Sequence, residues 1–281
     1  MRASNRLRTA SLGLAALAFA SCSSIKPAAE APDKVCRTKF DAGKKSFEKG
    51  RDPEAQEKLR DISVNCAAYD YAEEAQYMLG ESHHRTEQWM EAQTEFQILV
   101  DHWERTRYLD EARWKIVHAA YQQAPSWDRD PALIESALMK AEEFLADYST
   151  GEQADSARDL REDLIGRLAD RRYETAKLYL KMDEPQAATI YYQLLLKEFP
   201  QSKRVPVARM EMAKAYAMLD QFERATETLD TLKLETAKME QEKAALFGER
   251  IAITEKFVEK SRRKFEARKL REAKEARQDK L

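Results

Sequence analysis

Small and apolar residues recur at a fixed interval along the second half of the chain. Within one copy, a small residue is followed by a Tyr three positions later and by an Ala twelve positions later, and a second copy begins 37 residues further on. The paired residues are Ala176 and Ala213, Tyr179 and Tyr216, Ala188 and Ala225, Tyr192 and Leu229, and Leu195 and Leu232. This spacing is typical of two antiparallel helices joined by a tight turn, with small residues where the helices touch. Repetition at this length predicts a helical solenoid, which is a binding scaffold rather than an enzyme.

The same spacing extends toward the N-terminus. The steps of twelve from Gly43 to Ala55 and from Gly80 to Ala92 lie 37 residues apart, and they define repeats one and two. Repeat three is interrupted by a longer loop at 124–130. The helices of the later repeats are predicted over 109–123 and 131–148, over 152–181 and from Pro185, and within 205–232. Because no segment alternates steadily between apolar and polar residues, we expect an all-α fold without a sheet.

The N-terminus has the pattern of an export signal. Arg2, Arg6 and Arg8 precede an apolar run over 10–20, which is shorter than the roughly 20 residues needed to span a bilayer. Cys22 follows two small residues and resembles the lipid-attachment Cys of bacterial lipoproteins. That resemblance implies cleavage before Cys22 and acylation of this residue. Ser23 stands where such proteins have the Asp that retains them on the inner membrane. The resemblance therefore implies that the protein is located on the periplasmic face of the outer membrane.

Two further cysteines fall in repeat one. In the repeat register, Cys36 lies at the start of the first helix and Cys66 near the end of its antiparallel partner, and these two ends lie side by side in a hairpin. An exported protein occupies an oxidising compartment. We therefore predict a Cys36–Cys66 disulfide; the alternative is a pair of buried free thiols.

Charge is distributed unevenly although the net charge is only −2. Residues 256–281 carry eleven Lys or Arg against five Asp or Glu, so an acidic body precedes a basic tail. We expect residues 234–258 to pack as a capping helix on the last repeat and residues 259–281 to extend into solvent. The tail is either a solvated helix or a basic arm for anionic lipid headgroups or an acidic partner. Export argues against nucleic acid as a partner.

Three segments resemble a known family. The spacing of small residues is similar to that of the tetratricopeptide repeat (TPR), although His118 stands in repeat three where Gly or Ala is usual. Residues 167–179, 197–202 and 215–216 follow the order found in the BamD family of outer-membrane β-barrel assembly lipoproteins. The resemblance covers about residues 36–232. Residues 67–71 and 148–151 depart from the family's pattern, as expected for a divergent member.

The resemblance implies an all-α, TPR superhelix of five helical hairpins followed by a long C-terminal helix. The expected organisation is a signal peptide at 1–21, a tether at 22–34, repeats one to three at 35–150, repeats four and five at 151–233, and a charged helix at 234–281 with an exposed distal part. It also implies a scaffold subunit of the barrel assembly (BAM) complex that binds BamA and other BAM subunits. The competing interpretation is a TPR lipoprotein of another envelope system, such as a pilus-secretin pilot or a cell-division scaffold.

No arrangement of residues indicates catalysis. The sequence has no Gly-rich phosphate loop and no pair of Cys motifs with metal spacing. The adjacent His83 and His84 would point about 100° apart on a helix and cannot hold one metal together. We expect no enzyme activity, no metal and no cofactor.

The candidate site is the inner surface of the solenoid, which in TPR proteins is lined by one stripe of each first helix. Carried onto this chain, the stripe mixes aromatic rings with cations. The predicted groove residues are Arg37, Phe40, Lys44, Phe47, Tyr77, His84, Arg85 and Lys115. Rings of this kind accept apolar side chains of an extended peptide, and cations accept a C-terminal carboxylate. The resemblance implies C-terminal β-signals of unfolded outer-membrane proteins as ligands; the alternative is that the rings pack as core.

The resemblance also implies that repeats four and five dock the periplasmic domains of BamA. Tyr191 and Lys197 lie where the family has cationic interface residues. Tyr191 is not cationic, so this contact differs from the family's pattern.

Overall fold

The computed structural model describes residues 32–278, which form eleven helices and no strand. The predicted signal peptide, Cys22 and most of the predicted tether lie outside these residues. The helices are α1 (Pro32–Glu48), α2 (Asp52–Asn65), α3 (Ala72–Arg85), α4 (Trp89–His102), α5 (Leu109–Gln123), α6 (Ala132–Asp147), α7 (Glu152–Lys181), α8 (Pro185–Glu198), α9 (Val205–Met218), α10 (Phe222–Thr236) and α11 (Gln241–Gln278).

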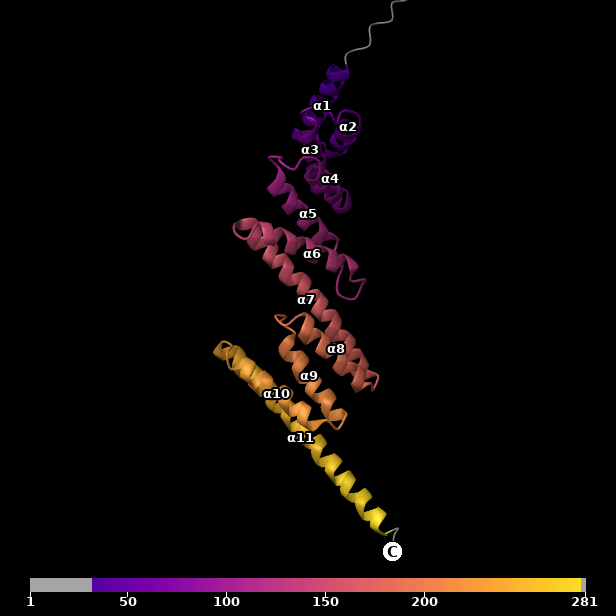
Figure 1. Ribbon diagram of the computed structural model, residues 1–281, viewed down its shortest axis with the longest axis vertical. Coiled ribbons are helices and arrows are strands. Elements are labelled where there is room, and N and C mark those ends of the chain that lie inside the picture. Colours follow the sequence, from indigo (N-terminus) through magenta and orange to yellow (C-terminus); the bar gives the residue numbers. More distant parts are fainter. Residues whose placement is uncertain (1–31, 279–281) are drawn as a thin grey trace, which may run out of the picture.

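The first ten helices form five antiparallel hairpins stacked along one axis, from α1 at one end to α11 at the other (Figure 1). Each helix packs on the next in the chain, and α1, α3, α5 and α7 also contact one another in succession. First helices that follow one another along one side generate a superhelix with an inner surface. This confirms the predicted fold class: an all-α, TPR-type array of five hairpins with a long terminal helix.

Close packing within each hairpin depends on the small residue identified in the sequence. A Cβ atom built on Gly43 would lie 2.9 Å from Leu59, and one built on Gly80 would lie 2.9 Å from Phe96. Leu59 and Phe96 are fully buried. The absence of a Cβ therefore allows the two helices of a hairpin to approach each other closely.

The turn of each regular hairpin is also repeated. Gly50, Glu87, Asp183 and Asp220 all have a left-handed backbone, with φ between 58° and 67°. In each case the next amide donates to the carbonyl five residues earlier, for example Gln88 N to His83 O at 2.9 Å. This is the Schellman type of helix end, in which one left-handed residue stops the helix and reverses the chain.

Repeat three departs from this scheme, as its sequence predicts. The loop that joins α5 to α6 is held from the side by α7: Arg167 donates to the carbonyl of Ala124 at 2.8 Å, and Arg171 donates to the carbonyl of Arg129 at 2.6 Å. The 30-residue α7 thus supports repeat three with its first half and builds repeat four with its second half. At 1.5 Å per residue it is roughly 45 Å long.

The N-terminal end of the array is closed by a disulfide. Cys36 of α1 and Cys66 at the end of α2 are bonded, with their Cα atoms 5.9 Å apart, and both are buried. Helix α1 begins at Pro32, inside the range expected for the tether. A Pro at the first position of a helix costs no hydrogen bond, because the first N–H groups have no partner within the helix. The negative charge of Asp33 in the first turn interacts favourably with the positive end of the helix dipole.

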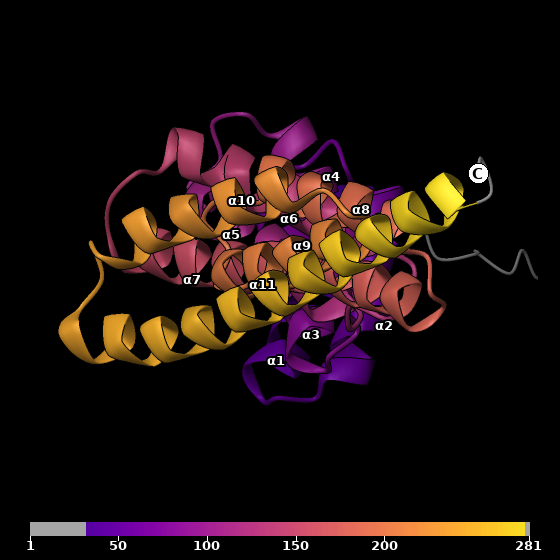
Figure 2. The ribbon, with the colours of Figure 1, turned by 90° about the horizontal axis from the view of Figure 1, so that it is seen from below.

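The C-terminal region differs from the sequence prediction in two respects. The helix is not continuous beyond Leu232, because α10 ends at Thr236 and α11 begins at Gln241. Helix α11 lies beside α10 (Figure 2), and its packed part extends past residue 258. The ring of Phe265 lies 5.5 Å from that of Phe222, and Arg268 pairs with Asp220 at 2.9 Å. The described residues after Arg268 (269–278) are all exposed, Leu270 by 60%.

Candidate peptide-binding groove

The predicted groove residues lie on α1, α3 and α5, but they do not form one uniform surface. Phe40 is 2% exposed and belongs to the core, where its ring centroid lies 5.0 Å from that of Tyr71. It therefore has no face for a peptide, and the expectation for this residue was wrong. Tyr71 comes from the α2–α3 connection, and its ring packs against α1 beside Phe40. Arg37 remains exposed beside it, paired with Asp41 at 3.3 Å.

An aromatic pair joins α3 to the α4–α5 connection. Tyr77 of α3 stacks on Tyr108 with ring centroids 4.0 Å apart and ring planes 8° apart. Arg107 lies over the Tyr108 ring at 4.7 Å. Burial, followed by a hydrogen bond with Glu111, raises the pKa of Tyr77 well above its usual value, so the hydroxyl stays protonated. Arg107 and Tyr108 lie in the α4–α5 connection, outside the repeat pattern, so no periodicity in the sequence points to them.

The groove cations are paired with acids of the neighbouring helix. Lys44 of α1 bonds Glu74 of α3 at 2.7 Å, and Lys115 of α5 reaches Glu81 of α3 at 3.0 Å. The hydrogen bond with Glu74 raises the pKa of Lys44. Arg107 also approaches Glu74, at 3.7 Å. A carboxylate ligand would therefore have to compete with an acid that is already in place.

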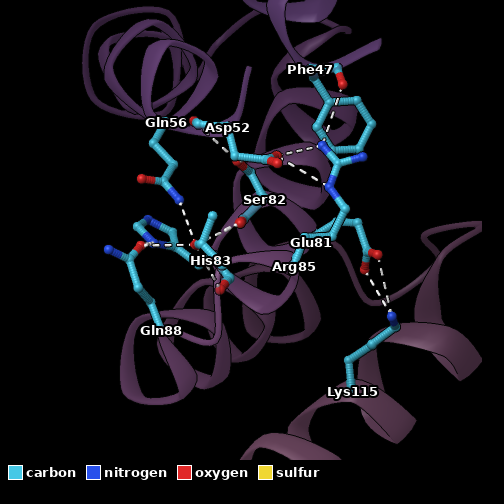
Figure 3. A network of polar contacts seen from close by, with 10 residues as sticks. Phe47, Asp52, Gln56, Glu81, Ser82, His83, Arg85, Gln88 and Lys115 are labelled. Carbon is cyan, nitrogen blue, oxygen red and sulfur yellow. Dashed lines mark hydrogen bonds and ion pairs between the residues drawn. The ribbon is translucent and has the colours of Figure 1, made fainter. Parts of the chain in front are cut away.

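Arg85 is held still more firmly, within a network that joins α2 to α3 (Figure 3). Its guanidinium binds Asp52 through Nε at 3.1 Å and Nη2 at 2.5 Å, and it lies 3.9 Å from the Phe47 ring centroid. Ser82 donates to the same carboxylate at 2.8 Å. Arg85 and Phe47 thus cover each other, so a structural role accounts for both side chains.

His84 lies beside a second histidine. Its Nε2 is 3.0 Å from Nδ1 of His118, and both rings pack edge-on against Trp89. Burial, and then the charge of Lys115, lowers the pKa of His84 to about 4, so the ring is neutral at pH 7. His118, which stands at the small-residue position of repeat three, thus turns toward repeat two.

The two predicted docking residues lie on α8 but do not face the same way. Tyr191 is half-buried and stacks on Tyr179 at 5.2 Å, whereas Lys197 is exposed near the end of the helix. Six residues along a helix separate two side chains by roughly 120°. A partner contacting both must therefore wrap around α8 or approach its edge.

Within residues 32–278 no cluster of three or more His, Cys, Asp or Glu side chains is placed to hold a metal ion. In the same part of the chain no helix is long and apolar enough to cross a membrane. The arrangement offers stacking surfaces, ion pairs and hydrogen-bond donors, which are the means of peptide and protein recognition.

The sequence model of the YfiO family, described as outer membrane lipoprotein, matches residues 32–232. The chain belongs to this family. YfiO is the BamD family domain, so the predicted family is confirmed. The match spans all five hairpins and ends within α10. No curated protein is significantly similar to the chain in sequence.

Several solved TPR structures are similar to this YfiO chain. The TPR domain of P58(IPK) is 13% identical with a TM-score of 0.40, and the similarity covers 83% of this chain but only 60% of that one. The TPR2AB domain of yeast Sti1, in complex with pHSP90, is 14% identical with a TM-score of 0.40, over 81% of this chain and 86% of that one. A TPR protein from Parabacteroides merdae is 14% identical with a TM-score of 0.35, over 82% and 98%. Because these scores are low, the family assignment rests on the sequence match.

Proposed function

We propose that this outer membrane lipoprotein is the TPR scaffold subunit of the BAM complex. In this role it is anchored through Cys22 on the periplasmic face of the outer membrane, and it binds BamA and the C-termini of unfolded outer-membrane proteins. The observation that carries the proposal is the family match over all five hairpins. A solenoid with half-buried rings and exposed cations on its helices suits assembly of proteins rather than catalysis.

The C-terminal β-signal of a barrel precursor ends in an aromatic residue and a carboxylate. We place its last residue at the Tyr77–Tyr108 stack, whose rings are half-buried. Its carboxylate would take the place of Glu74 on Lys44 and Arg107, which lie 2.7 and 3.7 Å from that acid. Arg107 is the more available of the two cations, because its side chain is 69% exposed.

Docking of BamA is assigned to repeats four and five. Lys197 is exposed on α8 and suits an acidic group of the partner, while Tyr191 and Tyr179 offer a flat aromatic pair roughly 120° around the helix from it. Cations and aromatic anchors of this kind are common at protein interfaces.

The complex is tested by purification from the native membrane in a mild detergent. Co-purification of a large barrel protein with repeated periplasmic domains is the expected result, and a photo-crosslinker at Lys197 should attach to it. The matched control is the same crosslinker at Glu142, an exposed residue of α6. Recovery of a secretin in place of the barrel protein would establish the competing envelope function.

The peptide site is tested with a fluorescent peptide that carries a barrel C-terminus ending in Phe. Arg107→Gln is expected to weaken binding about fivefold to tenfold, as for the loss of one charge-assisted contact. Amidation of the peptide should have a similar effect on the unaltered chain and little effect on Arg107→Gln. Lys256→Gln, on the exposed face of α11, serves as the control. Equal binding of the free acid and the amide would refute the carboxylate contact.

A further inference from the structure

Helix α11 occupies the place of a first helix in a sixth repeat. It packs on both α9 and α10, as each first helix packs on the hairpin before it. Gly248 lies 35 residues after Ala213, the small residue of repeat five. The residue before Gly248, Phe247, packs against the core. Helix α11 lies beyond residue 232, where the YfiO match ends.

The second helix of this repeat is missing from the described residues. In repeats one and two the small residue is covered by the partner helix, at 2.9 Å from Leu59 and from Phe96. No atom lies within 4 Å of a Cβ built on Gly248. The face that would pack against a second helix is therefore open on α11.

A hollow of about 260 Å³ lies where that helix would fit. Its walls come from Lys233 and Thr236 of α10, from Ala237 directly after that helix, and from Ala244, Gly248, Ile251 and Glu255 of α11. Helices α10 and α11 run side by side here (Figure 2). The open position thus continues the helix-on-hairpin interface that is repeated throughout the array.

We propose that this hollow receives an acidic, amphipathic α-helix of a partner protein, which completes the sixth hairpin. The helix lies antiparallel to α11 and places one large apolar side chain over Gly248, as Leu59 lies over Gly43. Charge favours an acidic helix: residues 256–278 of α11 carry ten Lys or Arg against four Glu. An antiparallel helix begins beside this basic half, where acids in its first turn also suit its own dipole.

A second copy of the chain does not fit this position. The second helices α2, α4, α6, α8 and α10 are each packed in their own hairpin. The apolar side chains that α11 leaves exposed, Leu246, Ile253 and Phe257, lie roughly 140–180° around the helix from Gly248. Two copies of α11 therefore cannot present these side chains to each other's hollow while keeping the hairpin geometry.

The chain itself provides a probe for the open position. Residues 222–236 form an amphipathic helix with four acids and two bases, and its Leu229 is the residue that faces Ala213 in repeat five. A labelled peptide of residues 221–237 is titrated with the full chain in detergent, and fluorescence anisotropy is measured. Saturable binding is expected, and absence of binding at millimolar protein would overturn the proposal.

Two substitutions locate the binding. Gly248→Leu fills the open position and should weaken peptide binding about tenfold or more. The matched control is Gly166→Leu, because Gly166 of α7 also has no atom within 4 Å of its Cβ position. Both changes replace a helical Gly by a better helix former, so neither is expected to unfold the protein. The peptide variant Leu229→Glu should not bind. Equal loss in the two Gly variants, or a chain that dimerises through α11, contradicts the proposal.

Discussion

Substitution of Gly80 by Ala tests whether the small residue of a hairpin is needed for close contact between its two helices. The added Cβ would lie 2.9, 3.0 and 3.1 Å from three ring carbons of Phe96. Carbon atoms in ordinary contact are about 3.5–4.0 Å apart. The ring must therefore move by about half an ångström, although Phe96 is fully buried among neighbours on α3, α4 and α5.

Two opposing effects decide whether Gly80→Ala raises or lowers the free energy of unfolding. Overfilling a packed core costs about 1–3 kcal/mol, whereas Ala in place of Gly inside a helix contributes about 1 kcal/mol of stability. We expect Gly80→Ala to lower the free energy of unfolding by about 0–2 kcal/mol. Gly166→Ala has only the favourable term, because no atom lies within 4 Å of that position. The two variants should differ by about 1–3 kcal/mol.

Urea unfolding followed by circular dichroism at 222 nm measures the difference. Phe96→Leu in the Gly80→Ala background should recover part of the loss, since the smaller side chain leaves room for the new methyl group. This recovery separates a local clash from general damage to the helix. If Gly80→Ala stabilises the chain as much as Gly166→Ala does, close contact at the small residue does not limit the hairpin, and the packing argument fails.

Three further changes have calculable effects. Cys36→Ser with Cys66→Ser opens a loop of 30 residues and should cost about 3–4 kcal/mol; reductant should then no longer shift the urea midpoint. Acidification from pH 7 to 5 should cost at most about 1 kcal/mol through His84, because its pKa is about 4 when folded, it takes up its proton near pH 6.5 when unfolded, and solvent screens the half-exposed ring. His84→Gln should flatten this dependence, and an unchanged slope would contradict the burial argument. Phe265→Ala should cost about 1–2 kcal/mol in thermal unfolding, whereas no loss would show that α11 is free beyond Val258.

Repetition made most of the fold predictable. The small residues and their spacing of twelve predict the hairpins. The long helix after the interrupted repeat three was also predicted, and the observed range of α7, Glu152–Lys181, is the predicted one. The break after Thr236 was not predictable in this way. The connecting residues Ala237 to Glu240 include neither Gly nor Pro and have ordinary helix propensity. The break is set by tertiary packing, because α11 must reverse direction to bury Ile251 and Val258 on the preceding hairpin.

The repeat register predicts which helices carry the candidate groove residues but not the contacts that these residues make. The repeat register places Lys44, Tyr77 and Lys115 on the inner surface, but it does not tell which acids lie opposite them. Two members of the central site, Arg107 and Tyr108, come from a connection whose path depends on the packing of α4 against α5. Sequence periodicity predicts the helices but not the contacts between elements that are distant in sequence.

The two halves of the inner surface differ in how their charges are paired. In repeats one to three, ion pairs link successive first helices, as Lys44 does with Glu74. In repeats four and five, pairs within one helix, such as Glu174 with Lys177, lie beside pairs that join the two helices of one hairpin, such as Arg172 with Glu198 and Arg209 with Glu235. Exposed pairs of either kind contribute only about 0–1 kcal/mol to stability, so their main effect is on the relative position of neighbouring helices.

This difference has a consequence for binding. A carboxylate that displaces Glu74 from Lys44 also removes a link between α1 and α3, so ligand binding in the first half is coupled to the spacing of the repeats. A partner that docks on α8 through Tyr191 and Lys197 does not displace the Lys44–Glu74 pair, so it leaves the spacing of α1 and α3 unchanged. We therefore expect peptide binding to alter hydrogen exchange at the ends of α1 and α3, and partner docking to protect α8 without such a change.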